Sequence, residues 1–307
     1  MSIPGRGDPL AALARLLASV EAVRHGRALY TLLFTFSTAG LLLAMAGSSM
    51  QAESQGWAVL QGVAAIAVAF YGSNATGMLL MDQARGRAGR EVADAVQQAL
   101  RTGHRLLLVM LAAMLAVAGV LGVLAAGLYV ARLPLVGPFV FAGMVPLGVV
   151  AVGLCVLVLA AVVGPLAGPA IWDGLDVRTT LRLLVKQARE RLLFTALMVS
   201  VLGAMTAAVG ALSTFVVVSG GRAVSALAVL VTGVELPPQQ LMAGLFGFGL
   251  RSLGPAGAPV AQTPHGVAAL VGGGMVFVLA IALPGLVYLR GVCALYLSVI
   301  GERRRSV

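Results

Sequence analysis

The chain has 307 residues, of which 60% are hydrophobic and only 10% are charged, and its formal net charge is +10. Soluble domains carry about 25% charged residues, and a water-soluble globule of this length could not cover its surface with so few polar groups. The composition therefore excludes a soluble enzyme, a secreted disulfide scaffold and a disordered tail, and it predicts a polytopic membrane protein.

Long apolar segments occur six times along the chain. A helix needs about 20 predominantly apolar residues to cross the hydrocarbon core, because each residue rises only about 1.5 Å. The segments that meet this requirement are residues 28–47, 57–81, 106–131, 137–166, 192–219 and 267–289. None has an Asp, Glu, Lys, Arg or His in its interior, and the runs are continuous rather than alternating, which favours helices over a closed barrel. The sequence thus predicts an all-α integral membrane fold with six transmembrane helices.

The longest connection, residues 220–266, contains two shorter apolar runs at 223–234 and 241–250. The first has 12 residues and is too short to cross the bilayer, which suits an interfacial or re-entrant helix. We therefore expect this connection to form a partly helical extracytoplasmic cap on the membrane surface.

Lys and Arg residues are distributed unevenly between the two sides of the predicted spans. Four precede the first span, five lie between spans two and three, five between spans four and five, and four follow the sixth, which places 18 of the 21 on one side. The positive-inside rule assigns this side to the cytoplasm, so both termini are expected there, in agreement with an even number of spans. Arg outnumbers Lys twenty to one, which is typical of a GC-rich genome and favours a bacterial inner (cytoplasmic) membrane.

The three cytoplasmic segments that precede spans one, three and five follow one plan. Each begins near an acidic residue (Asp8, Asp82 or Asp173), continues as an amphipathic basic helix and is followed by two spans. Such a helix can bury its apolar stripe at the headgroup boundary and keep its Arg side chains in the water layer. We therefore expect a single membrane domain over residues 1–307, built from pseudo-repeats at about 1–81, 82–172 and 173–307.

The third cytoplasmic segment has the most regular charge pattern. Its basic residues are Arg178, Arg182, Lys186, Arg189 and Arg191, of which the first four recur at helical spacing beside an apolar strip. Each such charge near an anionic leaflet contributes on the order of 1 kcal/mol. The pattern predicts a cytoplasmic collar that binds anionic lipid headgroups or an acidic protein partner, although topology alone also places basic residues here. A homo-oligomer or a subunit of a larger complex fits the same pattern.

Polar residues inside the first two spans form a second candidate group. Thr31, Thr35 and Thr38 recur at helical spacing in the first span, and Tyr71 and Asn74 lie in the second. A polar side chain in lipid must face protein, which favours a packing role for this group. The alternative is a path for a lipid or a small uncharged solute, which would make the protein a transporter or channel.

The residues that carry catalysis or bind metals are sparse and scattered. The three histidines and two cysteines lie far apart in the sequence, and neither a zinc-protease motif nor a Gly-rich phosphate loop occurs. We therefore expect a non-enzymatic protein without a metal or a cofactor. Topology accounts for the basic charge, and no aromatic–basic interleaving accompanies it, so no nucleic-acid partner is expected.

A short motif ends the fourth predicted span. The run Gly-Pro-Ala-Ile-Trp-Asp-Gly at residues 168–174, with the basic helix and span behind it, resembles bacterial multi-pass membrane domains, including those attached to some glycerophosphodiester phosphodiesterases. The resemblance covers about residues 150–300. It implies a helical membrane module and transfers no catalytic residue, because these 307 residues do not include a soluble phosphodiesterase domain.

Overall fold

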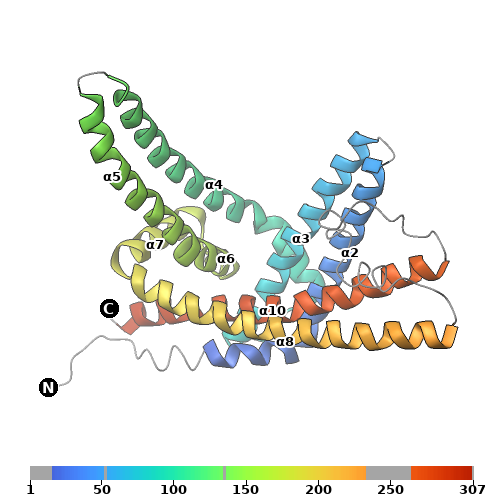
Figure 1. Cartoon of the computed structure of the whole chain (residues 1–307). Coiled ribbons are helices and arrows are strands. Elements are labelled where there is room, and N and C mark those ends of the chain that lie inside the picture. Colours follow the sequence, from blue (N-terminus) through green and yellow to red (C-terminus); the bar gives the residue numbers. More distant parts are fainter. Residues whose placement is uncertain (1–15, 52–53, 134–135, 233–263, 306–307) are drawn as a thin grey trace. The chain divides into compact units, whose positions relative to one another are not determined.

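The computed structural model describes residues 16–51, 54–133, 136–232 and 264–305, and every regular element in these ranges is a helix (Figure 1). The elements in chain order are η1 (Ala18–Arg24), α2 (Gly26–Gln51), α3 (Gln55–Ala84), α4 (Val92–Val130), α5 (Gly137–Val158), η2 (Leu159–Val163), α6 (Gly164–Trp172), α7 (Val177–Glu190), α8 (Leu192–Thr232) and α10 (Pro264–Arg305). The first is a 3-10 helix, and η2 is a single π-helical turn between α5 and α6. The predicted all-α fold is confirmed.

Six helices are long and apolar enough to cross a membrane. They are Gly26–Gly47, Gln55–Ala84, Val92–Val130, Gly137–Trp172, Leu192–Val224 and Val278–Val299. Each overlaps one of the six predicted spans, so the protein is a multi-pass membrane protein. α4 and α8 have 39 and 41 residues and are each about 60 Å long, twice the thickness of the hydrocarbon core, so both extend beyond it.

Three of the observed helices are longer than the sequence pattern suggested. The amphipathic segment after Asp82 does not form a helix of its own but becomes the first turns of α4. The apolar run expected to begin a separate interfacial helix at residue 223 instead continues α8 to Thr232. The sixth span was expected to end at residue 289, whereas α10 continues to Arg305. Gly103 in α4 and the Gly220–Gly221 pair in α8 lie inside these helices without ending them, since each Gly costs only about 1 kcal/mol relative to Ala.

The remainder of the predicted cap, including the run at 241–250, lies outside the described residues, and so does most of the first cytoplasmic segment. The chain falls into two compact units, one built around Gln97–Leu202 with the segment after Gly291, and the other around Leu17–Val96 with Gly203–Arg290. These units do not test the predicted pseudo-repeats, which remain a prediction.

The second unit is centred on the antiparallel hairpin of α2 and α3, which run side by side along their lengths (Figure 1). Close approach is possible because Gly72 of α3 lies directly against Thr35 of α2, so that even a Cβ atom at Gly72 would overlap the Thr35 side chain. The parts of α8 and α10 in this unit are joined by a hydrogen bond of 3.1 Å from Ser213 Oγ to the Ala280 carbonyl. Small and hydroxyl-bearing residues thus form the helix contacts, as is usual in membranes.

The first unit contains α5, η2, α6 and α7, most of α4, and the adjoining ends of α8 and α10. Residues 291–296 of α10 are buried here, and Tyr296 is completely inaccessible. Its hydroxyl donates a hydrogen bond of 3.0 Å to Asp173 Oδ2, which follows α6. Gly291 of α10 lies against Leu202 of α8 with no room for a side chain. These contacts fix the start of α7, where the candidate site lies.

Candidate functional site

The position of α7 is set by a sharp turn after α6. Gly174 has a φ of +96°, a conformation that glycine adopts without strain, and it turns the chain away from α6. Asp176 then caps α7, because its Oδ1 accepts a hydrogen bond of 3.3 Å from the Thr179 N–H. The hydrogen bonds from Thr179 and the neighbouring amides favour the carboxylate and lower the pKa of Asp176 from its ordinary value. The motif at residues 168–174 therefore comprises the end of α6, up to Trp172, and the turn at Asp173 and Gly174.

α7 has one buried face and one exposed face. The buried side chains are Thr180, Leu183, Leu184 and Gln187. Gln187 Nε2 donates a hydrogen bond of 2.8 Å to Thr195 Oγ1, and the same hydroxyl donates one of 2.9 Å to the Arg191 carbonyl. These bonds bridge the break at Arg191, where α7 ends and α8 begins. α7 is therefore a separate amphipathic helix, as the sequence predicted for this segment.

The structure places the five predicted collar residues together, four on α7 and Arg191 at its C-terminal end, and all five are exposed. Arg178, Arg182, Lys186 and Arg189 follow one another at intervals of four, four and three residues, so they project along one side of the helix. Lys186 Nζ lies 3.8 Å from Glu190 Oε1, but both side chains are more than half exposed, and such surface pairs offset little charge. The helix thus presents an exposed basic strip.

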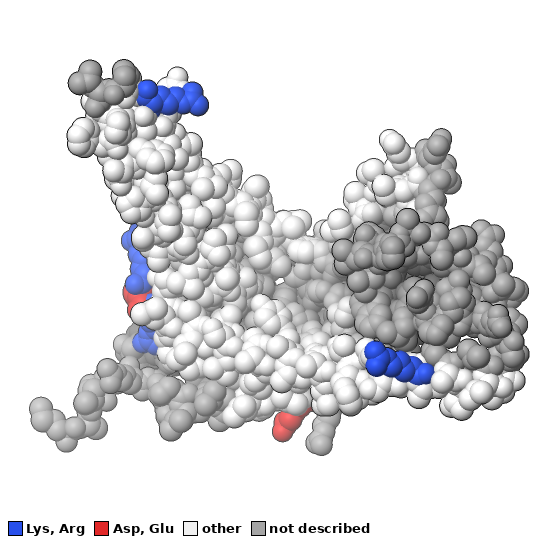
Figure 2. All heavy atoms as spheres, in the orientation of Figure 1, with Lys and Arg blue, Asp and Glu red and all other residues white. Residues whose placement is uncertain are grey.

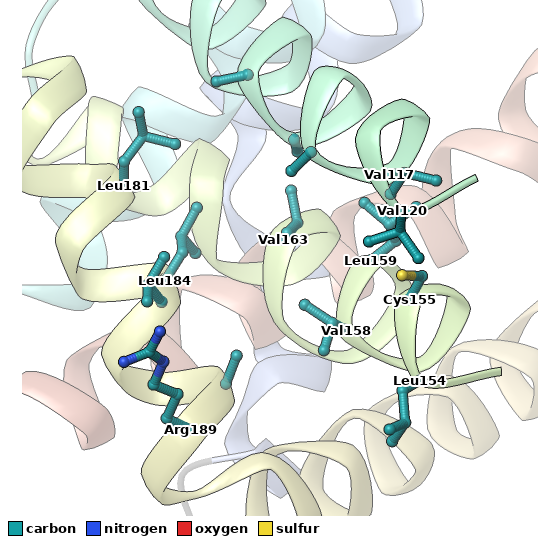
Figure 3. A pocket seen from close by; sticks show the side chains of 15 residues that line it. Val117, Val120, Leu154, Cys155, Val158, Leu159, Val163, Leu181, Leu184 and Arg189 are labelled. Carbon is teal, nitrogen blue, oxygen red and sulfur yellow. The ribbon is translucent and has the colours of Figure 1, made fainter. Parts of the chain in front are cut away.

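An apolar cavity of about 350 Å³ lies beside α7, within the first unit. Its fifteen lining residues come from α4, from α5 and the adjoining η2, and from α7 (Figure 3). Val117 and Val120 of α4 face Cys155 and Leu159, and α7 contributes Leu184 (Figure 3). Fourteen of the fifteen are Ala, Val, Leu or Cys, and the exception is Arg189. This cavity was not predicted from the sequence, which indicated only that α4 and α5 are two membrane spans.

The π-helical turn η2 forms part of the cavity wall through Leu159 and Val163. Such turns hold one extra residue per turn and occur frequently at functional sites. Here the cause lies in the sequence that follows, because Pro165 has no N–H to donate to the carbonyl four residues earlier. Within the π-helical turn, Ala161, Val162 and Val163 are buried. Pro165 was a signal in the sequence that could have indicated an irregular helix at this position.

The predicted polar group of the first two spans has a different environment. Thr31 and Thr35 are buried, and their hydroxyls donate hydrogen bonds of 2.8 and 2.7 Å to the carbonyls of Arg27 and Thr31 in their own helix. Asn74 is 4% exposed, and its Nδ2 donates a hydrogen bond of 2.8 Å to the Phe70 carbonyl. Thr38 and Tyr71 are half-buried. Thr35 meets Gly72 across the hairpin, an arrangement that supports a packing role.

Sequence reasoning missed a buried ion pair at the end of the second span. Arg90 binds Asp82 through two hydrogen bonds, from Nε to Oδ2 at 2.5 Å and from an Nη to Oδ1 at 2.9 Å. Arg27 at the start of α2 reaches the same loop, with Nη1 at 3.4 Å from the Gly89 carbonyl. The sequence signal that could have indicated this ion pair is an acidic residue at the end of a span, Asp82, followed by a segment rich in Gly and Arg. This pair fixes the loop and leaves Arg90 unavailable for a partner.

No protein-family model matches the sequence, and searches of the curated proteins and of the solved structures also find no match. The function must therefore be argued from the site itself. The described residues contain no group of three or more His, Cys, Asp or Glu that could hold a metal ion. What the site offers is an exposed row of cations beside an apolar cavity, an arrangement that suits binding of an amphipathic anion.

Proposed function

We propose that this protein is a non-enzymatic multi-pass module of a bacterial inner membrane, with both termini in the cytoplasm, whose α7 helix binds anionic lipid headgroups. The observation that carries the proposal is the exposed basic strip of α7, which stands beside a buried apolar face on a separate helix. An amphipathic helix of this kind lies in the interface plane with its cations at the headgroup level.

The strength of the interaction follows from the number of charges. Each Lys or Arg near an anionic surface contributes about 1 kcal/mol, so four charges produce a clear preference for anionic over zwitterionic lipid. Salt weakens this preference, because the side chains are exposed and the Debye length is about 8 Å at physiological ionic strength. An acidic protein partner would use the same strip. Lipid binding by the purified protein, measured without such a partner, distinguishes a lipid ligand from a protein ligand.

The test compares charge variants of the full chain in nanodiscs. Replacing Arg178, Arg182, Lys186 and Arg189 together by Gln should abolish enrichment of phosphatidylglycerol over phosphatidylcholine, measured as lipids retained in native mass spectrometry. The matched comparison uses two double variants. Arg178→Gln with Arg182→Gln removes two charges of the α7 strip, and Arg87→Gln with Arg101→Gln removes two charges outside it. All four residues are exposed. If both double variants lose enrichment equally, the effect is one of net charge and the proposal for α7 fails.

The proposed orientation has its own test. In a chain with Cys155→Ser and Cys293→Ser, Arg182→Cys provides a single exposed thiol on α7. A membrane-impermeant maleimide should leave this thiol unlabelled in intact spheroplasts and label it in inverted membrane vesicles. Labelling in intact spheroplasts would place α7 on the periplasmic side and overturn the cytoplasmic collar.

The alternative function, transport of a lipid or small uncharged solute past Thr31, Thr35 and Asn74, has less support. The hydrogen bonds of these side chains are made to the carbonyls of their own helices, and the contact of Gly72 with Thr35 closes the space between α2 and α3. Packing explains these contacts, whereas a path would need polar groups turned toward a continuous opening.

A further inference from the structure

We infer that the cavity between α4, α5–η2 and α7 is a binding site for one acyl chain of an anionic phospholipid, whose phosphate is held by Arg189. This inference rests on the proposed function and deepens it, because it assigns one defined lipid position beside the basic strip. The cavity was not part of the predicted collar, and it joins the collar only through Arg189.

The lining chemistry selects a hydrocarbon. All lining residues except Arg189 carry aliphatic or thiol side chains, so a polar ligand would lose its hydrogen bonds to water without replacement. The volume of about 350 Å³ lies within the range of about 300–1,000 Å³ that is typical of ligand pockets. An apolar cavity in a membrane-spanning helix pair is bordered by lipid. An acyl chain is therefore the apolar ligand that is present at the highest concentration.

The cavity begins within the inner leaflet and extends past the middle of the hydrocarbon core. Its α4 wall extends from Ala112 to Val120, and the predicted span begins at Leu106, so the wall lies about 9–21 Å along the helix from the cytoplasmic end at 1.5 Å per residue. The middle of a 30 Å hydrocarbon core is about 15 Å deep. An acyl chain that descends from a cytoplasmic headgroup therefore passes this wall.

Arg189 supplies the complementary charge. It is an exposed residue of α7 and at the same time a lining residue of the cavity (Figure 3). A guanidinium binds phosphate oxygens with two parallel hydrogen bonds, which positions the headgroup at the place where the chain enters. The long Arg side chain can keep its charge in the headgroup layer while its methylenes cover apolar surface.

The surface of the α4–α5 hairpin agrees with contact with hydrocarbon. Figure 2 shows this hairpin as almost continuously uncharged along its length, with basic atoms near its tip. Leu111, Leu115 and Val156, for example, are each more than half exposed. A continuous surface of such residues suits contact with lipid, so acyl chains are available next to the cavity.

The experiment uses the full chain in nanodiscs that contain phosphatidylglycerol with a diazirine at the end of one acyl chain. Crosslinked peptides identified by mass spectrometry should come from the cavity walls, α4 residues 112–120 and the segment 154–163. Ala113→Phe fills the cavity and should abolish these crosslinks. The matched control, Ala118→Phe, lies on the same helix but is exposed and outside the cavity, so it should retain them.

Headgroup selection is tested with the corresponding phosphatidylcholine probe. Arg189→Gln should lower the preference for the anionic probe roughly fivefold, the factor that corresponds to about 1 kcal/mol. Arg189→Lys should keep most of this preference, and Arg101→Gln, which removes an exposed charge outside both the α7 strip and the cavity, should leave the cavity crosslinks unchanged. An equal effect of Arg101→Gln and Arg189→Gln would overturn the role of Arg189.

A measurement on the unaltered protein covers the case in which Ala113→Phe fails to fold. Cys155 lines the cavity and Cys293 is completely buried elsewhere. Delipidation in detergent should raise the rate at which a maleimide modifies Cys155, and added phosphatidylglycerol should lower it again, with Cys293 as the unreactive internal control. A rate that is independent of lipid would overturn the cavity site.

The two proposals fail in different ways. If crosslinks spread evenly over the lipid-facing helices and Ala113→Phe behaves like Ala118→Phe, the acyl-chain site is wrong, while enrichment that depends on the α7 charges still supports the proposed function. If the four-residue Gln variant enriches phosphatidylglycerol as well as the unaltered chain does, headgroup binding by α7 is wrong, and the phosphate role of Arg189 fails with it.

Discussion

The two helical hairpins of this protein, α2–α3 and α4–α5, are both made of long apolar helices, yet their helices meet in different ways. In α2–α3 the helices are in contact along their lengths, with Gly72 against Thr35. In α4–α5 the close contact occurs near the turn, where Gly127 lies against Met144. Farther from the turn the helices separate, and the apolar cavity begins.

The difference shows that hydrophobicity places a helix in the bilayer but does not pair it with a neighbour. Lipid is as apolar as Leu or Val, so pairing depends on close packing of small residues and on hydrogen bonds. The α2–α3 hairpin has a Gly–Thr contact at its interface, whereas farther from their turn α4 and α5 leave an apolar cavity between them. The first hairpin is thus closed by its own side chains, and the second contains the cavity for which we propose a lipid ligand.

The contact of Gly72 with Thr35 is the strongest test of this contrast. Gly72→Leu should destabilise the protein by about 3 kcal/mol or more, because overpacking typically costs about 1–3 kcal/mol and even its Cβ would overlap Thr35 Oγ1. The matched control is Gly153→Leu in α5, where no atom lies within 4 Å of an added Cβ. Thermal unfolding in detergent should show a large loss for the first variant and little for the second; similar losses would contradict the contrast.

The ends of the two regions also differ, since Asp82 in the last turn of α3 pairs with Arg90, while Asp173 after α6 is bound by Tyr296. Asp82→Asn should cost about 2–3 kcal/mol, somewhat less than the loss of a fully buried pair, because the Arg90 side chain is 21% exposed. The unfolding midpoint in detergent measures this loss. Glu91→Gln, at an exposed position in the same loop, is the control, and a loss as large as that of Asp82→Asn would show that the pair is not the cause.

Tyr296→Phe removes only the hydroxyl that binds Asp173 Oδ2. The expected loss is about 1.5–2 kcal/mol, because hydrogen bonds to charged groups contribute about 1.5–3 kcal/mol. The ring remains in its buried position, so the helix content measured by circular dichroism should not change. An unchanged melting temperature would mean that other contacts alone fix the exit of α6.

Asn74→Leu separates packing from transport in the closed hairpin. A packing role predicts a loss of about 0.6–1.7 kcal/mol, the range measured for polar contacts between membrane helices, with no change in solute or lipid flux in proteoliposomes. A stable variant with altered flux would instead favour the transporter interpretation and would make α2–α3 the functional hairpin.

The sequence predicted the spans and α7 because these depend on local properties. About 20 consecutive apolar residues suffice for a span, and the spacing of Arg178, Arg182 and Lys186 with the cap at Asp176 suffices for an amphipathic helix. The same reasoning gave a separate helix after Asp82, which was wrong because residues 92–106 contain no residue that ends a helix and so continue into α4.

The cavity and the bond between Asp173 and Tyr296 could not be predicted in this way. The two residues of this bond are 123 positions apart, and only the packing of α10 in the first unit brings them together. Ala113, Val117 and Val158 would suit a packed interface equally well, so their composition does not distinguish a cavity from a filled contact. Helix separation depends on the path of the backbone, here through η2 and Pro165, rather than on any single residue type.

The smallest expected effect concerns the cap of α7, which positions the basic strip next to the open hairpin. The pKa of Asp176 is lowered by its hydrogen bond from Thr179, so its carboxylate stabilises the folded state above the ordinary pKa, and this contribution is lost as the pH falls through the lower folded value. Asp176→Ala should therefore melt slightly below the unaltered protein at pH 7, and the gap should close below about pH 3.8.

Asp176→Asn provides the control for this pH dependence, because Asn is an equally good cap that does not titrate. The gap between this variant and Asp176→Ala should stay constant with pH, measured as the difference in melting temperature across the same series. The effect is small because Asp176 is fully exposed and solvent screens its charge. A gap between the unaltered protein and Asp176→Ala that persisted in acid would show that the neutral Asp176 side chain caps α7 as well as its carboxylate does, and that the charge of the cap does not contribute.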